Sequence, residues 1–233
     1  MKKLFYMLLA GMFATAVYAQ SEAGDTSYTA NYFIGMEDAS KGKICKDIEV
    51  KVDIRKEIPR WSRDAILKEL SDKLKPAGRL PYPPEDSLFK TCESWETEKM
   101  SLIADIMFWE PGDQMCVVYY LDEEDCCAPR KNKRSAYVHN LDLKNKDFYQ
   151  LEPLYKKYKT QIDQDVMSNV RRKYRSNRDR RFINMITIEE LPPLGFNKGG
   201  LVVFTRSAIG GKNQHVPWVV SQARLPETLP TTR

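Results

Sequence analysis

The stretch NLDLKNKDFYQLEPLYKKY, residues 140–158, decides the fold because its periodicity changes in the middle. Up to residue 143, and from residue 136, apolar and polar side chains alternate as in a half-buried strand. The polar run at 144–147 predicts a turn. From Leu151 onward apolar residues recur every three or four positions, which is the spacing of a helix. The stretch therefore predicts a strand, a turn and a long helix in direct succession.

The predicted helix, residues 151–175, combines an apolar stripe with a basic remainder. Its stripe consists of Leu151, Leu154, Tyr155, Tyr158, Ile162, Val166, Val170 and Tyr174. Between residues 155 and 181 there are ten Lys or Arg and three Asp, a local excess of seven positive charges. A second helix is predicted at residues 62–75, with Ser62 as its N-cap and with Pro76 and Gly78 ending it.

Strand patterns fill much of the remaining sequence. A strand is predicted at 48–54, a hairpin at 102–109 and 114–121 around a Pro-Gly turn, an extended segment at 182–191, a second hairpin at 194–204, and a last strand at 216–225. We expect one α+β domain at residues 31–225, with a mostly antiparallel sheet of about six strands packed against the two helices. Residues 20–30 and 226–233 are polar and are predicted to be a flexible terminus and a tail.

The beginning of the chain has the pattern of a secretory signal peptide. Lys2 and Lys3 precede an apolar run of 14 residues, and small residues at Ala16 and Ala19 predict cleavage before Gln20. The run is shorter than the roughly 20 residues that span a bilayer. We therefore expect residues 1–19 to be removed and the mature protein to be periplasmic or secreted, with no membrane span. The sequence does not indicate an oligomeric state.

The net charge is too small to indicate nucleic acid. It is +5 for the whole chain and near +3 once Lys2 and Lys3 are removed. Export across a membrane also argues against a nucleic-acid partner.

All five cysteines lie in the predicted mature chain: Cys45, Cys92, Cys116, Cys126 and Cys127. In an oxidising compartment several cysteines favour disulfides. We expect two bridges among Cys45, Cys92, Cys116 and one of the adjacent pair, with the connectivity left open. Two histidines and no Cys-x-x-Cys motif argue against a metal site.

No catalytic or cofactor-binding set stands out. There is no Gly-x-Ser-x-Gly motif, the glycine pairs do not match a phosphate-binding loop, and His139 and His215 read as packed or solvated side chains. The acidic run at 122–125 and the basic loop at 130–134 read as solvated, mutually neutralising segments. We expect no catalytic residue, no cofactor and no metal.

The same stretch resembles a known family. Asn140-Leu141-Asp142-Leu143, the turn after it and the Leu151-Glu152-Pro153-Leu154 step are similar to the RsiV-like family, the ectodomain of lysozyme-sensing anti-sigma factors, as are Phe196 and the strand from Gly200. The Gly-Gly-Ala-His step of that family is replaced by Cys126-Cys127-Ala128-Pro129, and an aromatic Tyr-Glu element is missing, so lysozyme binding is not carried over. The resemblance implies a non-catalytic extracytoplasmic α/β binding domain of a bacterium.

The functional expectation is therefore an exported, non-catalytic binding domain of the bacterial cell envelope that recognises a protein or a cell-wall glycan through its basic helix. The candidate partner-binding residues are Lys156, Lys157, Lys159, Arg171, Arg172, Lys173 and Arg175. A plainer interpretation is that the helix packs its stripe on a sheet and solvates its charges. Two other functions stay open: an envelope or peptidoglycan-modifying hydrolase that uses carboxylates, and a structural subunit of an envelope assembly.

Overall fold

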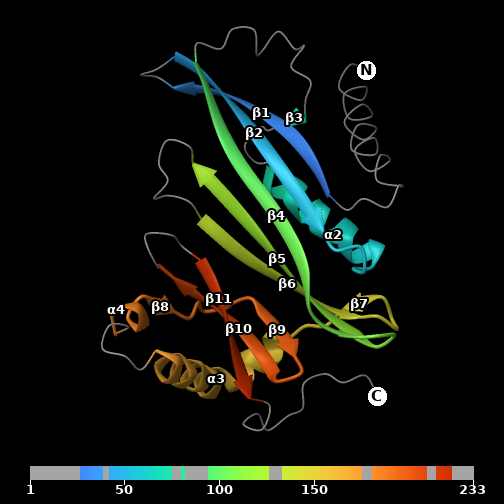
Figure 1. Cartoon of the computed structure of the whole chain (residues 1–233), viewed down its shortest axis with the longest axis vertical. Coiled ribbons are helices and arrows are strands. Elements are labelled where there is room, and N and C mark those ends of the chain that lie inside the picture. Colours follow the sequence, from blue (N-terminus) through green and yellow to red (C-terminus); the bar gives the residue numbers. More distant parts are fainter. Residues whose placement is uncertain are drawn as a thin grey trace.

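Figure 1 shows the computed structural model, which describes residues 27–38, 42–74, 80–81, 94–125, 133–174, 180–208 and 214–221. The predicted signal peptide, 1–19, and the tail, 226–233, lie outside these residues. Among the helices of the described residues, none is long and apolar enough to cross a membrane.

The larger sheet has seven strands in the order β3-β1-β2-β4-β5-β6-β7. The strands are β1 (Ser27–Asp38), β2 (Gly42–Ile54), β3 (Leu80–Pro81), β4 (Ser94–Glu110), β5 (Gln114–Asp125), β6 (Lys133–Asp142) and β7 (Asp147–Phe148). Every pair is antiparallel except β2 and β4. Helix α2 (Arg60–Leu74) lies between those two strands in the chain. Parallel neighbours need such a crossover connection.

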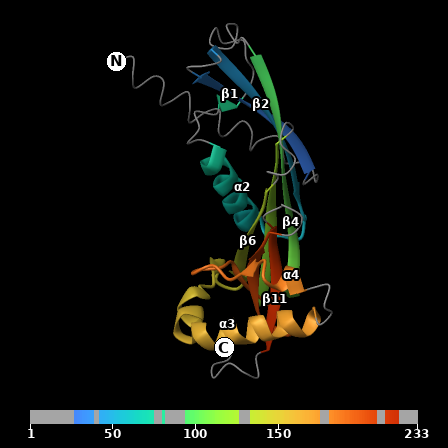
Figure 2. The same cartoon turned by 90° about the vertical axis from the view of Figure 1, so that its left-hand side faces the viewer.

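Helix α2 covers one face of the larger sheet (Figure 2). Its buried Ile66 and Leu70 belong to a core with alternate residues of the central strands, including Val50 and Val52 of β2 and Leu102 of β4. The period-2 pattern of residues 48–54 therefore has the predicted cause, since one face of β2 is buried and the other carries charges.

The smaller sheet has four strands and its own helix. The strands are β8 (Ile186–Thr187), β9 (Leu194–Asn197), β10 (Gly200–Ser207) and β11 (Gln214–Ser221), and both β8 and β9 pair with β10. Helix α3 (Glu152–Lys173) packs its apolar stripe on this sheet, and the short helix α4 (Arg180–Ile183) follows it. In Figure 1 the smaller sheet and α3 occupy the lower end of the molecule.

The two sheets share a hydrophobic contact. Val118 of β5 and Ala136 of β6 form one buried cluster with Val202 and Phe204 of β10. Alternate residues of β10 therefore face in two directions, with Leu201 and Val203 in the core that α3 covers and Val202 and Phe204 against the larger sheet. The smaller sheet is consequently buried on both faces along β10.

The α+β class is confirmed, whereas the arrangement differs from a single sheet of about six strands. The strands divide into two sheets, and one pair is parallel. Strand β1 begins at Ser27, inside the segment 20–30 that was expected to be a flexible terminus, because Ser27 and Tyr28 pair with Asp53 and Val52 of β2. Residues 182–191 are not continuously extended, since they include the end of α4 and only two strand residues.

The stretch at 140–158 forms the predicted strand, turn and helix, but the short strand β7, which pairs with β6, lies between the turn and the helix. The Asp142 carboxylate accepts hydrogen bonds from the backbone N–H groups of Lys144 and Asn145 at 2.9 Å each, which fixes the turn. These bonds, with that to Asn145 first, hold the pKa of Asp142 below its usual value. The buried Asn140 donates its amide to the Leu194 carbonyl at 2.9 Å and so joins β6 to β9. Asn140 and Asp142, two of the residues on which the family resemblance rests, therefore have architectural roles in this chain.

Candidate binding surface on helix α3

The basic residues of α3 lie near its start and in its last turn, and Lys159, near the start, is paired within the helix. Lys159 Nζ lies 2.5 Å from Asp163 Oδ2 and 3.3 Å from the Tyr155 hydroxyl, which itself donates to Asp163 Oδ1 at 2.7 Å. Hydrogen bonding to Asp163 raises the pKa of Lys159, and burial raises the pKa of Tyr155 to about 12. This triad spans a kink at Tyr158, where the backbone leaves helical geometry. The charge of Lys159 is therefore paired with Asp163 within α3.

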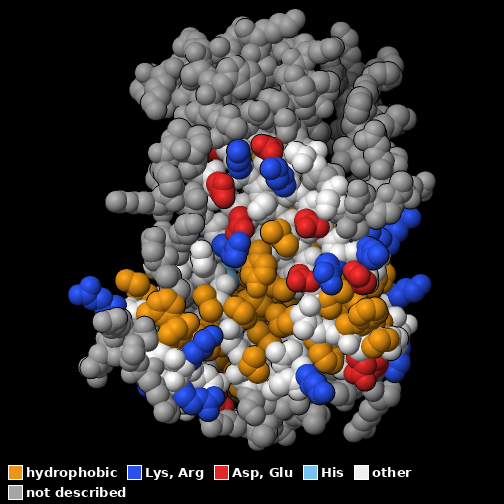
Figure 3. Space-filling model, in the orientation of Figure 1, with side chains coloured by type: hydrophobic (Ala, Val, Ile, Leu, Met, Phe, Trp, Pro, Cys, Tyr) orange, Lys and Arg blue, Asp and Glu red, His pale blue; other side chains and the backbone are white. Residues whose placement is uncertain are grey.

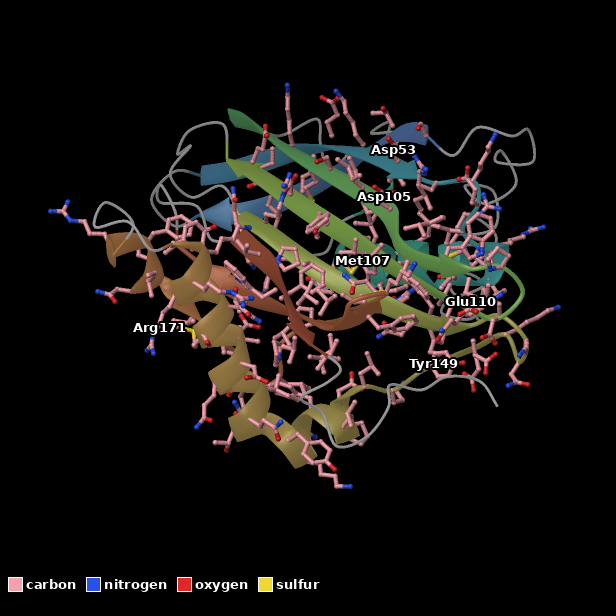
Figure 4. All side chains as sticks on the ribbon, turned by 60° about the horizontal axis from the view of Figure 1, so that its bottom comes forward. Asp53, Asp105, Met107, Glu110, Tyr149 and Arg171 are labelled. Carbon is pink, nitrogen blue, oxygen red and sulfur yellow. The ribbon has the colours of Figure 1, made fainter. Side chains whose placement is uncertain are left out.

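The second group, Arg171, Arg172 and Lys173, forms the last turn of α3 and is exposed to solvent. Arg171 points away from the sheets on the outer side of the helix (Figure 4). Within the part of the chain that the structure describes, none of the three is in an ion pair with a carboxylate. Positive charge at a helix C-terminus also stabilises the helix, because it interacts favourably with the helix dipole. The group nonetheless leaves three adjacent cations open to an anionic partner.

Two members of this group are oriented by contacts with β11. Arg172 donates to Asn169 Oδ1 at 2.8 Å, and Asn169 donates its amide to the Val219 carbonyl at 2.9 Å. Lys173 Nζ lies 5.0 Å from the centroid of the Trp218 ring, a cation–π contact. The end of α3 is thus held against the edge strand of the smaller sheet.

The predicted partner-binding residues consequently fall into three sets. Lys156 and Lys157 are exposed near the start of α3, and Lys157 lies over the Tyr158 ring. Lys159 is engaged within the helix, whereas Arg171, Arg172 and Lys173 form the open group. Arg175 lies outside the described residues.

A polar network that the sequence did not predict joins α2 to the larger sheet. His139 of β6 places Nε2 3.1 Å from Glu69 Oε1 and Nδ1 3.5 Å from the Ser62 hydroxyl, and Glu69 also accepts a hydrogen bond from Tyr119. Ser62 is therefore not the N-cap of α2, which begins at Arg60. The sequence offered no signal for this network, because Ser62 and His139 are 77 positions apart.

The order Ser-His-Glu resembles a hydrolase triad. Whether it could act as one depends on whether a substrate can reach the Ser62 hydroxyl. Ser62 is 0% exposed. The cavity beside the network, lined in part by Glu69, Lys73 and Tyr137, has a volume of about 10 Å³. That is room for about one water molecule. Lys73 Nζ lies 3.9 Å from the centroid of the Tyr137 ring. Burial lowers the pKa of Lys73. A nucleophile needs contact with its substrate, and the Ser62 hydroxyl is not exposed for such contact in this conformation. We call Ser62, His139 and Glu69 the latch, because they link α2 to β6.

His215 is a packed side chain that joins the two sheets. It is the second residue of β11, its side chain is 8% exposed, and its Nδ1 accepts the backbone N–H of Ala136 at 3.2 Å. Glu189 lies 3.7 Å from His215 Nε2 and 3.2 Å from Arg206. In the described residues no group of three or more His, Cys, Asp and Glu could hold a metal ion.

The one cysteine whose side chain is described differs from the expected arrangement. Cys116 is a free, buried thiol on β5. It therefore does not form one of the two predicted disulfide bonds. Burial raises its pKa to about 12, and the Phe196 backbone opposes this shift only in part. The side chains of Cys45, Cys92, Cys126 and Cys127 lie outside the described residues.

Hydrophobic side chains also gather on one face of the molecule. Figure 3 shows them across the lower half of the view, below a band of intermixed acidic and basic side chains. Among the described residues of the whole molecule, the exposed large apolar side chains are Ile103, Trp109, Met185, Leu191 and Val219. They come from both sheets and from the segments between strands.

Comparison with known proteins finds only remote similarity to solved structures. No protein-family model matches the chain, and no curated protein matches it. A DUF3298 family protein from Pseudomonas aeruginosa PAO1 is similar with a TM-score of 0.48 at 12% identity, over 86% of this chain and 93% of that one. Another, from Bacteroides fragilis NCTC 9343, has a TM-score of 0.44 at 13% identity, over 88% and 92%. The resemblance to the RsiV-like family therefore stays a prediction from the sequence.

Proposed function

We propose that this protein is an exported binding domain of the bacterial cell envelope, periplasmic or secreted, which recognises an anionic envelope protein or cell-wall glycan without catalysis. The observation that carries the proposal is the open group Arg171, Arg172 and Lys173, three exposed cations on a helix end that two contacts hold against β11. A fixed cationic surface attracts anionic partners and sets their orientation. The signal-peptide pattern at 1–19 supports the location.

The test is charge reversal with a control of equal net charge. The mature chain, residues 20–233, is compared with Arg171→Glu/Arg172→Glu and with Lys68→Glu/Lys99→Glu, whose exposed lysines lie on α2 and β4. Capture of envelope proteins after cross-linking and co-sedimentation with purified peptidoglycan are measured, together with the melting temperature. We expect the first variant to lose binding at least tenfold and the control to keep it, with binding falling as salt rises. Equal loss in both variants, or no capture by the parent chain, contradicts the proposal.

One alternative function, a structural subunit of an envelope assembly, is supported by a separate observation. The hydrophobic side chains in Figure 3 would suit a structural subunit of an envelope assembly. Sedimentation of the chain as a large, salt-resistant complex with envelope proteins, unaffected by charge reversal on α3, would favour that function. The alternative of a carboxylate hydrolase has a separate test. Turnover of peptidoglycan by the purified chain, abolished by the single substitution Glu69→Gln, would favour it.

A further inference from the structure

The chain has two histidines, and each of them joins two layers of the fold through a different kind of partner. His215 of β11 accepts the backbone N–H of Ala136, on β6, at its Nδ1 atom. His139 of the latch faces the Glu69 carboxylate with Nε2 and the Ser62 hydroxyl with Nδ1. A carboxylate accepts hydrogen bonds and a hydroxyl can donate or accept, whereas a backbone N–H can only donate. The two rings therefore respond differently when they take up a proton.

The contact with Ala136 fixes the protonation state of His215. An imidazole nitrogen accepts a hydrogen bond through its lone pair, so Nδ1 carries no proton while the bond from Ala136 exists. The neutral ring accordingly has its proton on Nε2, the nitrogen that faces Glu189. A protonated ring carries a proton on both nitrogens, and its Nδ1–H would point at the Ala136 N–H. The charged ring and this contact exclude each other.

The charged groups of the smaller sheet beside His215 are already paired. Glu189, between β8 and β9, has Oε1 3.7 Å from His215 Nε2, but the same oxygen lies 3.2 Å from Arg206 of β10. Glu189 attracts a charged ring, whereas Arg206 repels it. Attraction at Nε2 also cannot replace the bond that Nδ1 loses, because the two nitrogens face different elements.

The larger sheet adds no unpaired carboxylate at Ala136. On the face that carries Ala136, Arg134 of β6 and Asp122 of β5 form their own ion pair at 2.6 Å. Tyr120 of β5 pairs with Ala136 in the register, and burial raises the pKa of Tyr120, so its hydroxyl stays neutral. These neighbours of Ala136 therefore do not compensate a charge on His215.

The latch tolerates a proton on its histidine. A protonated His139 can donate from Nε2 to Glu69 Oε1, at 3.1 Å, and from Nδ1 to the Ser62 hydroxyl oxygen, at 3.5 Å. Both partners can accept, so both contacts persist in either protonation state.

We propose that His215 is a pH-sensitive link between the two sheets, which holds β11 to β6 while its ring is neutral and releases it when the ring takes up a proton. Histidine side chains change charge between about pH 8 and pH 5. The open state binds the additional proton, so the link is more stable at higher pH and is lost as the pH falls. The apolar cluster around Phe204 does not titrate, so the release is confined to the start of β11. This device goes beyond the proposed binding function and does not depend on it.

The experiment follows the mature chain, residues 20–233, by nuclear magnetic resonance as the pH is lowered. The ring nitrogen signals report which nitrogen carries a proton, and His139→Gln assigns them because the chain has only two histidines. The Ala136 amide signal reports the bond to His215. Hydrogen exchange of that amide is compared with His215→Asn at the same pH, so that the chemical exchange rate cancels. Asparagine offers an acceptor oxygen near the place of Nδ1 and does not titrate.

We expect His215 to carry its proton on Nε2 at high pH, and its ring and the Ala136 amide to change with one midpoint as the pH falls. Exchange protection of the Ala136 amide should then drop at least about fivefold, the value of one ordinary hydrogen bond. His139→Gln should keep this drop and His215→Asn should remove it. An Ala136 amide that does not follow the His215 ring, or a drop that persists in His215→Asn or disappears in His139→Gln, would overturn the proposal. If His215→Asn does not fold, the ring and amide signals of the parent chain decide.

Discussion

At the scale of single residues, Gly195 is a position between the two sheets where there is no room for a side chain. A Cβ built on Gly195 would lie 2.9 Å from Cys116 Sγ and 3.2 Å from Val138 Cγ1. Both neighbours are side chains of the larger sheet, whereas Gly195 belongs to β9 of the smaller one. The glycine is needed for the approach of the strands, and the small thiol of Cys116 fills the remaining space.

We predict that Gly195→Ala lowers the free energy of unfolding by about 1–3 kcal/mol, the usual cost of overpacking a filled core. Cys116→Ala in the same chain should recover part of that loss, because the nearest atom is then removed. Urea denaturation of the two single variants and the double variant measures the coupling. Strictly additive effects would show that the contact with Cys116 is not the source of the cost.

At the scale of elements, α2 is held to the larger sheet by both an apolar stripe and a polar latch. Ile66 is 0% exposed in the core, while Ser62, His139 and Glu69 form the latch. The Ser62–His139 separation of 3.5 Å is at the long limit of a hydrogen bond. Burial of the stripe should therefore dominate the attachment of this helix.

Ile66→Ala is expected to cost about 2–5 kcal/mol of unfolding free energy, because it removes buried apolar carbons and leaves a cavity. Ser62→Ala should cost about 1 kcal/mol, the net value of an ordinary hydrogen bond. Thermal and urea unfolding of both variants, with hydrogen exchange of α2, provide the comparison. If Ser62→Ala proved the more damaging substitution, the latch rather than the stripe would hold the helix.

At the scale of the whole molecule, the cluster of Val118, Ala136, Val202 and Phe204 couples the two sheets. Phe204 is 0% exposed, and its ring meets that of Tyr120 edge-on at a centroid distance of 6.5 Å. The hydrogen bond from the Ala136 backbone N–H to the His215 ring nitrogen Nδ1 adds a second link. We therefore infer that the sheets unfold together.

Phe204→Ala is expected to lower the free energy of unfolding by about 3–5 kcal/mol. It should reduce hydrogen-exchange protection in β5 and β6 as well as in β10 and β11. Mass spectrometry of peptides from each sheet gives the readout, and Leu191→Ala, at a site that is 48% exposed, is the control. Loss of protection confined to the smaller sheet would mean that the sheets are independent.

The local elements could be read from the sequence because their signals are local. Alternation at 48–54, the Glu110–Asp113 turn and the stripe from Leu151 each depend on neighbours a few positions apart. The turn has the expected left-handed glycine, with Gly112 at φ 77°. Helices α2 and α3 begin and end within two residues of the predicted limits. Of the candidate site, the sequence identified the basic residues of α3 but not which of them Asp163 engages.

Tertiary structure alone decided the parallel pairing of β2 with β4, the division into two sheets, the Ser62–His139–Glu69 latch and the contacts that hold the end of α3 against β11. Each of these brings together groups that are far apart in the chain, such as Asn169 and Val219, which are 50 positions apart. A side-chain period reports which face of an element is buried, but not what covers it. The identity of the covering element depends on packing between distant segments, and only the folded chain contains that information.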